Sequence, residues 1–136
     1  MPKFLFGKPT SIERKVTKLV RKLSKEYNFA YRLNHSIKGG YNVDIFIPSF
    51  NFVIELQGGY YHADPRIYEG KKLNEMQLHN VSRDKRKRIF LDQLYNYIIW
   101  WETEINQKNF GKEFNKIMRE ALKEISLGNK YQKEFI

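Results

Sequence analysis

The sequence YNVDIFIPSFNFVIELQGGYYH, from Tyr41 to His62, predicts the centre of the fold. It contains two short runs rich in Val, Ile and Phe, residues 41–47 and 51–57, and Pro48 directly follows the first run. Such runs favour β-strands, and proline can neither donate to a ladder nor continue a central strand. We therefore expect a β-hairpin whose tight turn covers residues 48–50.

Two carboxylates, Asp44 and Glu55, interrupt this apolar hairpin. A buried charge is costly unless it is paired or bound to a cation, so each acid either forms a salt bridge with a Lys or Arg or binds a metal. Side chains alternate along a strand, so Glu55 and Gln57 share one face while Ile54 and Leu56 turn away. The hairpin can fold Asp44 against that face. Three oxygen-bearing side chains at one end of a sheet favour a hard cation such as Mg²⁺.

This arrangement resembles the PD-(D/E)XK nuclease superfamily, whose motif is a proline or other residue, Asp, a spacer, Glu, any residue and Lys. Here Asn42 and Val43 stand at the proline position, and Gln57 replaces the lysine. Three segments are similar to the very-short-patch repair endonucleases and the related phage homing endonucleases: VIELQGGYYH (residues 53–62), RDKRKR (residues 83–88) and YNYIIWWETEI (residues 95–105). The resemblance covers residues 10–105.

The resemblance implies an α/β fold with a restriction-endonuclease-like core, in which helices flank a central mixed β-sheet. It also implies a Mg²⁺-dependent endodeoxyribonuclease, with Mn²⁺ expected to substitute for Mg²⁺. The metal ligands would be Asp44, Glu55, the carbonyl of Leu56 and Glu13, and Gln57 would stand at the lysine position of the catalytic site.

The same resemblance implies that His62 takes a proton from the attacking water and that Asp84 orients its ring. Imidazole suits this role because it titrates near neutral pH. Asp84 has a structural alternative, an ion pair with Arg88 one helical turn later. Glu13 has one as well, because its spacing from Thr10 is that of a capping box at a helix start. The sequence leaves both alternatives open.

Hydrophobic periodicity predicts the other elements. We expect a helix that begins after Thr10 and ends near Tyr27, a first strand at residues 29–33 and a turn at residues 35–40. A helix from about residue 74 to 94, a fourth strand at residues 95–101 and a closing helix at residues 110–125 should follow. Because a helix precedes the fourth strand, this connection is a crossover, and the strand should lie parallel to a neighbour.

One stripe of the helix at residues 74–94 is polar in its middle. Its members, at helical spacing, are Leu73, Gln77, Asn80, Asp84 and Leu91. A core helix would place apolar side chains there, so we expect the polar part of this stripe to point into the cleft of the site.

The chain is basic, with a net charge of +10, and residues 1–38 carry ten Lys or Arg against two Glu. Such a surface favours a polyanion, and we expect DNA; a merely solvated helix face is the alternative. For Tyr60 and Tyr61, which follow the hairpin, packing within the protein is the alternative to stacking on DNA bases. The residues expected to contact DNA are Lys15, Lys18, Lys22, Tyr60, Tyr61, Arg83, Lys85, Arg86, Lys87 and Arg88.

With 136 residues and no cysteine, residues 1–136 are expected to form a single nuclease domain without disulfides, suited to a reducing cytoplasm. No apolar run approaches the length of a membrane span, and residues Phe4, Leu5 and Phe6 should pack on the domain. Alternative functions are a Holliday-junction-resolving nuclease of the same superfamily, a non-catalytic DNA-binding module, or a nuclease acting on RNA. The oligomeric state stays open, although cutting both strands would favour a homodimer.

Overall fold

The computed structural model describes residues 10–135, and the expected packing of residues 4–6 lies outside this range. A five-stranded sheet has the order β1-β2-β3-β4-β5. The strands are β1 (Arg32–Ser36), β2 (Asn42–Ile47), β3 (Phe52–Gln57), β4 (Asn96–Trp101) and β5 (Gln132–Phe135). Neighbours from β1 to β3 are antiparallel, whereas β4 lies parallel to β3 and β5 parallel to β4. The predicted α/β fold with a mixed sheet is therefore confirmed.

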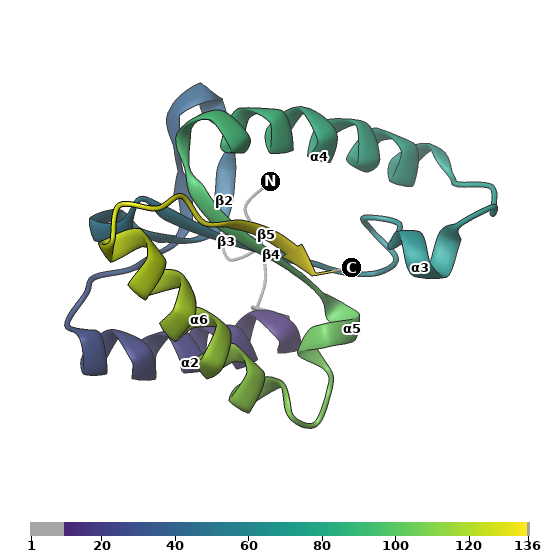
Figure 1. The fold of residues 1–136 in the computed structure, drawn as a ribbon. Helices are drawn as coiled ribbons and strands as arrows, with labels where there is room; N and C mark the ends of the chain where they lie inside the picture. The colour runs from purple at the N-terminus through teal and green to yellow at the C-terminus, as the bar shows by residue number, and fades with distance from the viewer. Residues whose placement is uncertain (1–9, 136) are drawn as a thin grey trace.

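Helices cover both faces of this sheet (Figure 1). Their bounds are α2 (Ser11–Tyr27), α3 (Pro65–Tyr68), α4 (Glu75–Leu94), α5 (Glu102–Ile105) and α6 (Phe110–Ser126), with 3₁₀ turns η1 (Lys38–Gly40) and η2 (Pro48–Phe50). Helices α2 and α6 lie together against one face, and α4 lies across the other. We call these the α2/α6 face and the α4 face.

Each face has its own apolar core. The larger core, on the α2/α6 face, joins Val16 and Phe114 of the helices to Ile54, Leu56 and Trp100 of the strands. The smaller core, on the α4 face, contains only one buried side chain of the helix itself, Leu91, packed on residues such as Val53 and Ile99 of the sheet. Helix α4 is therefore attached to the sheet near its C-terminal end by apolar packing.

The start of α2 confirms the predicted capping box. The Thr10 hydroxyl accepts a hydrogen bond from the Glu13 amide, and a Glu13 carboxylate oxygen accepts one from the Thr10 amide at 2.9 Å. Both bonds satisfy amides that have no partner within the helix. Helix α2 ends as predicted at Tyr27, where Asn28 adopts a left-handed conformation with φ of 54°.

The predicted first strand at residues 29–33 is wrong by three residues, because β1 begins only at Arg32. Phe29 instead packs edge-on against Phe50, with ring centroids 6.0 Å apart. It thus joins the core on the α2/α6 face directly after α2. Its apolar character reflects this packing and not a strand. His35, which was expected to begin a turn, lies in β1 and pairs with Val43.

The hairpin and the crossover match the expectation. Turn η2 joins β2 to β3, and the αL conformation of Asn51 moves the start of β3 to Phe52. Helix α4 then returns the chain, so that β4 runs parallel to β3 from the pair Phe52↔Asn96 to the pair Gln57↔Trp101. The closing helix α6 ends at Ser126, just before Gly128 with φ of 87°.

Strand β5 was not predicted. It pairs with β4, stacks Phe135 on the Trp100 ring with centroids 5.6 Å apart, and places Glu134 where it accepts a hydrogen bond from Trp101 Nε1 at 2.9 Å.

Within residues 10–135, the helices are all too short or too polar to cross a membrane.

Candidate functional site

Asp44 lies where β2 and β3 separate. The ladder between these strands runs from Ile47↔Phe52 to Ile45↔Ile54 and goes no further toward the site. Beyond it, a carboxylate oxygen of Asp44 accepts a hydrogen bond from the Leu56 amide at 2.8 Å. The side chain thus replaces a main-chain carbonyl as the acceptor, which fixes its position at the mouth of the gap between the strands.

Glu55 lies beside Asp44 and is 6% exposed. It forms an ion pair with the ammonium of Lys87 from α4, although the buried Oε1 atom has no hydrogen bond of good geometry. Burial raises the pKa of Glu55 to about 8, the Asp44 carboxylate adds to the rise, and Lys87 opposes it. A buried carboxyl group that neighbours a second carboxylate is poised to exchange its proton for a cation.

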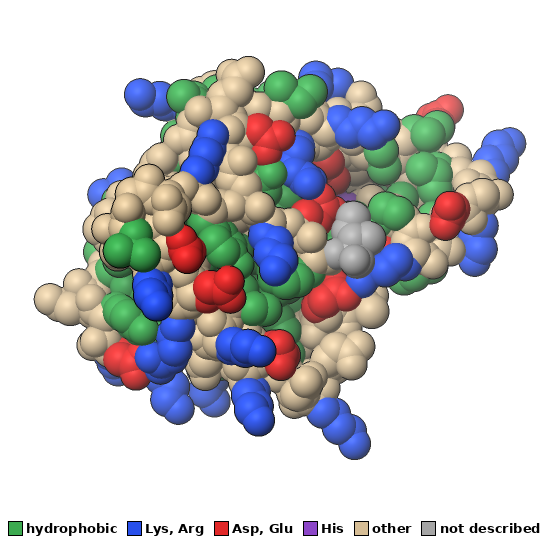
Figure 2. All heavy atoms as spheres, viewed as in Figure 1, with side chains coloured by type: hydrophobic (Ala, Val, Ile, Leu, Met, Phe, Trp, Pro, Cys, Tyr) green, Lys and Arg blue, Asp and Glu red, His purple; other side chains and the backbone are tan. Residues whose placement is uncertain are grey.

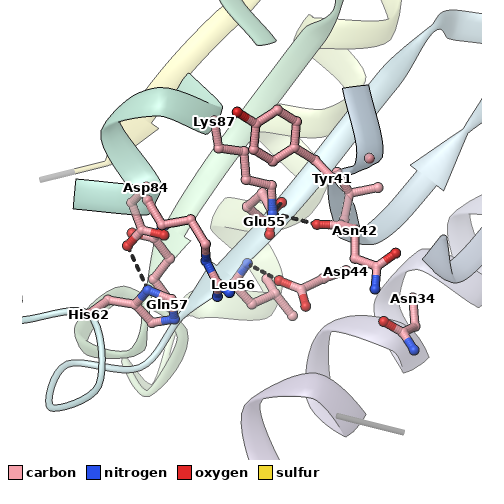
Figure 3. Close-up of a pocket in the computed structure, with 13 residues that line it drawn as sticks. Asn34, Tyr41, Asn42, Asp44, Glu55, Leu56, Gln57, His62, Asp84 and Lys87 are labelled. Atoms are coloured by element: carbon pink, nitrogen blue, oxygen red, sulfur yellow. Dashed lines mark hydrogen bonds and ion pairs between the residues drawn. The ribbon is translucent and has the colours of Figure 1, made fainter. Parts of the chain in front are cut away.

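These groups line one polar cavity of about 260 Å³ (Figure 3). Asp44, Glu55 and Gln57 are brought together there, as their spacing predicted. Leu56 also lines the cavity, but its side chain is buried in the core on the α2/α6 face, so it contributes main-chain atoms. The rest of the wall comes from β1, the turn after it, β2, the loop after β3 and α4. Its residues are, in that order, Asn34; Gly40 and Tyr41; Asn42 and Val43; His62; and Arg83, Asp84 and Lys87.

His62 and Asp84 form a second pair of polar side chains in the cavity. His62 Nδ1 lies 2.7 Å from Asp84 Oδ2, and both side chains are about one-fifth exposed, at 19% and 22%. A carboxylate can only accept, so Nδ1 carries a proton; in the neutral ring Nε2 then keeps a free electron pair. The alternative pair of Asp84 with Arg88 does not form, because Arg88 donates to Tyr97 and Glu134 instead.

The loop that carries His62 is tied to the end of the sheet. The Gly59 amide donates to the Glu102 carboxylate at 3.1 Å, and the His62 amide donates to the Gly58 carbonyl at 3.2 Å. The first of these two contacts gives Glu102 a structural role at the end of β4. Further along, burial acts to raise the pKa of the fully buried Asp64, but the hydrogen bonds it accepts from the guanidinium and the main-chain amide of Arg66 outweigh this and lower it.

Glu13 is not among the residues that line this cavity. One of its carboxylate oxygens caps α2, as the structural alternative required, and the other is buried without a hydrogen-bond partner. Across residues 10–135, no cluster of three or more His, Asp or Glu side chains has the arrangement of a metal site. The structure therefore does not group Glu13 with Asp44 and Glu55 as a third ligand.

The two carboxylates nevertheless fit a magnesium ion. Mg²⁺ keeps several waters and is usually bound by one or two carboxylates together with substrate phosphate oxygens. The ammonium of Lys87 already shows that a cation is favourable against Glu55. Asp44, Glu55 and main-chain atoms of Leu56 are the groups that could hold such an ion.

The basic residues expected to contact DNA lie on both faces of the sheet. Arg83 and Lys87 line the cavity, and Lys85 and Arg86 are exposed on α4 beside it. Figure 2 shows acidic side chains and a histidine in the hollow beneath α4, with Lys and Arg side chains around it. Helix α2 lies on the opposite face with Lys15, Lys18 and Lys22.

Not all of these residues are equally accessible to a ligand. Lys15 donates to the Ile105 carbonyl, and Arg88 is held in an ion pair with Glu134. Tyr60 and Tyr61, in contrast, are 51% and 60% exposed, and their rings contact each other edge to face at 5.3 Å. The two tyrosines therefore offer aromatic surface beside the cavity.

Sequence reasoning missed the contribution of Lys87 to the site, because it assigned this residue to phosphate contacts alone. Lys87 follows Asp84 by three positions, and residues at this spacing share a helix face. That spacing was a signal that the ammonium would enter the same cavity. Nothing comparable marked Asn34 or Tyr41, which reach the cavity only through the path of β1 and the turn after it.

Comparison with known proteins finds no family model that matches this chain and no curated protein with significant sequence similarity.

Proposed function

We propose that this protein is a metal-dependent endonuclease that hydrolyses phosphodiester bonds in DNA, as members of the PD-(D/E)XK superfamily do. The observation that supports it most is one polar cavity in which the Asp44 and Glu55 carboxylates meet the hydrogen-bonded pair of His62 and Asp84. Two acids for a cation and an oriented imidazole are the groups that phosphodiester hydrolysis by a metal-bound water requires.

Asp44 and Glu55, with main-chain atoms of Leu56, would hold the ion. When bound, Mg²⁺ supplies a Lewis acid that polarises a phosphoryl oxygen and lowers the pKa of a coordinated water. The hydrogen bond that Asp44 accepts from the Leu56 amide holds the first carboxylate in place without an ion. Glu55 would bind the ion in its ionised form, in place of its present ion pair with Lys87.

His62 acts as the general base. Its Nε2 accepts a proton from the attacking water, and the Asp84 carboxylate stabilises the resulting imidazolium through Nδ1. The ammonium of Lys87 and the guanidinium of Arg83, both at the cavity wall, offset the negative charge that develops on the phosphate. Gln57 can donate its amide hydrogens to a phosphate oxygen, but it has no charge to contribute.

DNA would dock over the open side of this cavity along α4. The exposed cations Arg83, Lys85 and Arg86 supply phosphate contacts there, which position the duplex without reading its sequence. Tyr60 and Tyr61 stand at the same edge with exposed rings that can stack on bases.

The proposal is tested by incubating labelled linear duplex, four-way junction and RNA of the same sequence with Mg²⁺ or Mn²⁺. We expect cleavage of DNA by the wild type, loss of cleavage in Asp44→Asn, and retention in Asp92→Asn, a matched change at an exposed aspartate on the far part of α4. Preference for the four-way junction would identify a resolving enzyme. Cleavage that persists in Asp44→Asn, or binding without any cleavage, would overturn the proposal.

A further inference from the structure

One stripe of α4 binds three consecutive residues of the loop after β3. Gln77 Nε2 donates to the Tyr60 carbonyl at 2.8 Å, Asn80 Nδ2 donates to the Tyr61 carbonyl at 2.8 Å, and Asp84 Oδ2 pairs with His62 Nδ1 at 2.7 Å. We call these three contacts the α4 clamp. The polar part of the stripe therefore has a partner at each position, and only its last member reaches the cavity.

The α4 clamp replaces the apolar packing that this part of α4 lacks. Gln77 is 2% exposed, yet it binds the loop by hydrogen bonds, and Leu91 is the only other buried residue described for the helix. The contact of this buried amide with the Tyr60 carbonyl is costly to disturb, because breaking it leaves both groups without partners. The first half of α4 is thus held mainly through the loop that carries His62.

We propose that Gln77 and Asn80 are positioning residues for His62, acting through the carbonyls of Tyr60 and Tyr61. This inference rests on the proposed nuclease function. Asp84 orients the imidazole ring itself, but the ring reaches the correct place only if the main chain before it is fixed. Asn80 binds the carbonyl of the peptide that supplies the His62 amide, so it controls the position of the His62 Cα atom.

The loop is held from two sides, by the sheet and by α4. The contacts with α4 determine how far the tip of the loop lies from the sheet. Glu102 binds the Gly59 amide from the end of β4, and the His62 amide returns to the Gly58 carbonyl. Those contacts fix the base of the loop, whereas Gln77 and Asn80 fix its tip against α4. Displacement of a catalytic group by about 1 Å can cost about 10²-fold in rate.

Asn80→Ala is the variant of choice, because Asn80 is only partly buried and its loss should not unfold the chain. Gln93→Ala removes an amide of similar size from the exposed end of the same helix and is the matched control. We expect Asn80→Ala to lower the single-turnover cleavage rate by about 10- to 100-fold while the affinity for DNA in Ca²⁺ stays unchanged. Gln93→Ala should leave both unchanged.

The double variant shows whether Asn80 acts through the histidine. In a His62→Ala background, Asn80→Ala should change the remaining cleavage rate by less than about twofold, since residues that act as a unit are not additive. An equal loss in both backgrounds would overturn the proposal.

Amide hydrogen exchange gives a readout that needs no cleavage. Asn80→Ala should accelerate exchange at residues 62–64, whose amides donate to the carbonyls of residues 58–60, and leave the amides of β3 and β4 protected as in the wild type. Unchanged exchange in this loop would refute the α4 clamp even if the enzyme cuts DNA. Accelerated exchange in a protein that never cuts would retain the clamp and reject the nuclease function.

Discussion

Glu55 combines two properties that conflict in a folded protein, because it is almost fully buried and it is acidic. Burial and the neighbouring Asp44 favour its protonated form, and Lys87 favours its ionised form; the net effect raises its pKa to about 8. A cation of higher charge in this place would reverse the balance, since it stabilises both carboxylates together. On the proposed function, the same residue would therefore link folding, pH and metal binding.

Without metal, the stability of the protein should fall as pH rises toward about 8. The pKa of Glu55 is about 8 when folded and 4.5 ordinarily, so between these values the folded chain holds a proton that the unfolded chain has lost. The free energy of unfolding must then decrease with rising pH, by at most about 1.4 kcal/mol per pH unit. Denaturant unfolding from pH 5 to 8.5 measures this decrease.

Glu55→Gln is the matched variant for this measurement, because glutamine resembles the protonated acid and cannot titrate. We expect its stability to depend less on pH than that of the wild type, while Glu69→Gln, at an exposed position, keeps the wild-type dependence. Identical pH profiles for the wild type and Glu55→Gln would contradict the assignment of the raised pKa to this residue. Added Mg²⁺ should raise the free energy of unfolding of the wild type at pH 8, and it should not raise that of Glu55→Gln.

Asp84 should matter through the tautomer that it selects. In Asp84→Asn, an amide that can donate faces His62 Nδ1, which favours the proton on Nε2 and removes the free electron pair from the side of the cavity. We predict a fall in the single-turnover cleavage rate of about 10² or more, with DNA affinity retained. Single-turnover kinetics against Asp92→Asn test this, and equal rates would exclude His62 as the general base.

Among the elements, strand β5 ties its neighbour β4 to α4. Glu134 accepts from Trp101 Nε1 of β4 and pairs with Arg88 of α4. The side chain of Glu134 is only 11% exposed, so its removal leaves two donors poorly satisfied.

Glu134→Ala should therefore lower the free energy of unfolding by about 1–3 kcal/mol. Lys133→Ala is the control, because Lys133 lies on the same strand with an exposed side chain that only overlies Phe135. Thermal and denaturant unfolding of both variants provide the comparison. A loss no larger in Glu134→Ala than in Lys133→Ala would mean that β5 does not hold α4.

The elements that could be predicted from sequence are those with a strong local signal. Helix α2 has a capping box and an apolar stripe, and the hairpin has two apolar runs around Pro48. Strand β5, with the sequence QKEF, has no such signal and exists because the edge of β4 and the Trp100 ring are available to it. The start of β1 was predicted too early because Phe29 looked like a strand residue. Its apolar side chain instead packs on Phe50 directly after α2.

The site shows the same division. The spacing of Asp44, Glu55 and Gln57 on a hairpin was sufficient to bring them together, and the resemblance to repair endonucleases correctly paired His62 with Asp84. Glu13 could not be decided from sequence, because a capping box and a ligand use the same carboxylate. Lys87 lies in a run of basic residues, and the composition of this run does not indicate which of them enters the cavity.

At the scale of the whole molecule, basic residues lie on both faces of the sheet. We expect those on the two faces to affect DNA affinity and DNA cleavage differently. The exposed cations of α4 lie beside the cavity, whereas those of α2 lie on the opposite side of the sheet (Figure 1). Contacts at the cavity should contribute to both affinity and cleavage. Contacts on the far face can add only to affinity, because they do not orient the bound phosphate.

The double variant Arg83→Gln/Lys85→Gln should lower DNA affinity, reduce the salt dependence of binding by about one unit of slope per lost contact, and slow cleavage of bound DNA. The double variant Lys18→Gln/Lys22→Gln should reduce affinity and slope and leave the cleavage rate of bound DNA unchanged. Binding titrations at several salt concentrations and single-turnover rates separate the two. Slower cleavage of bound DNA in the α2 variant would show that both faces contact the scissile segment.

The measurement that tests the nuclease assignment most directly is the single-turnover rate of nicking of supercoiled plasmid, with Mg²⁺ and with EDTA, for the wild type and Asp44→Asn. We predict nicking or linearisation only with Mg²⁺, and its loss in Asp44→Asn although that variant still binds DNA. Nicking that survives EDTA or the loss of Asp44, or an intact plasmid bound by wild-type protein in Mg²⁺, would contradict a metal-dependent nuclease built on Asp44 and Glu55.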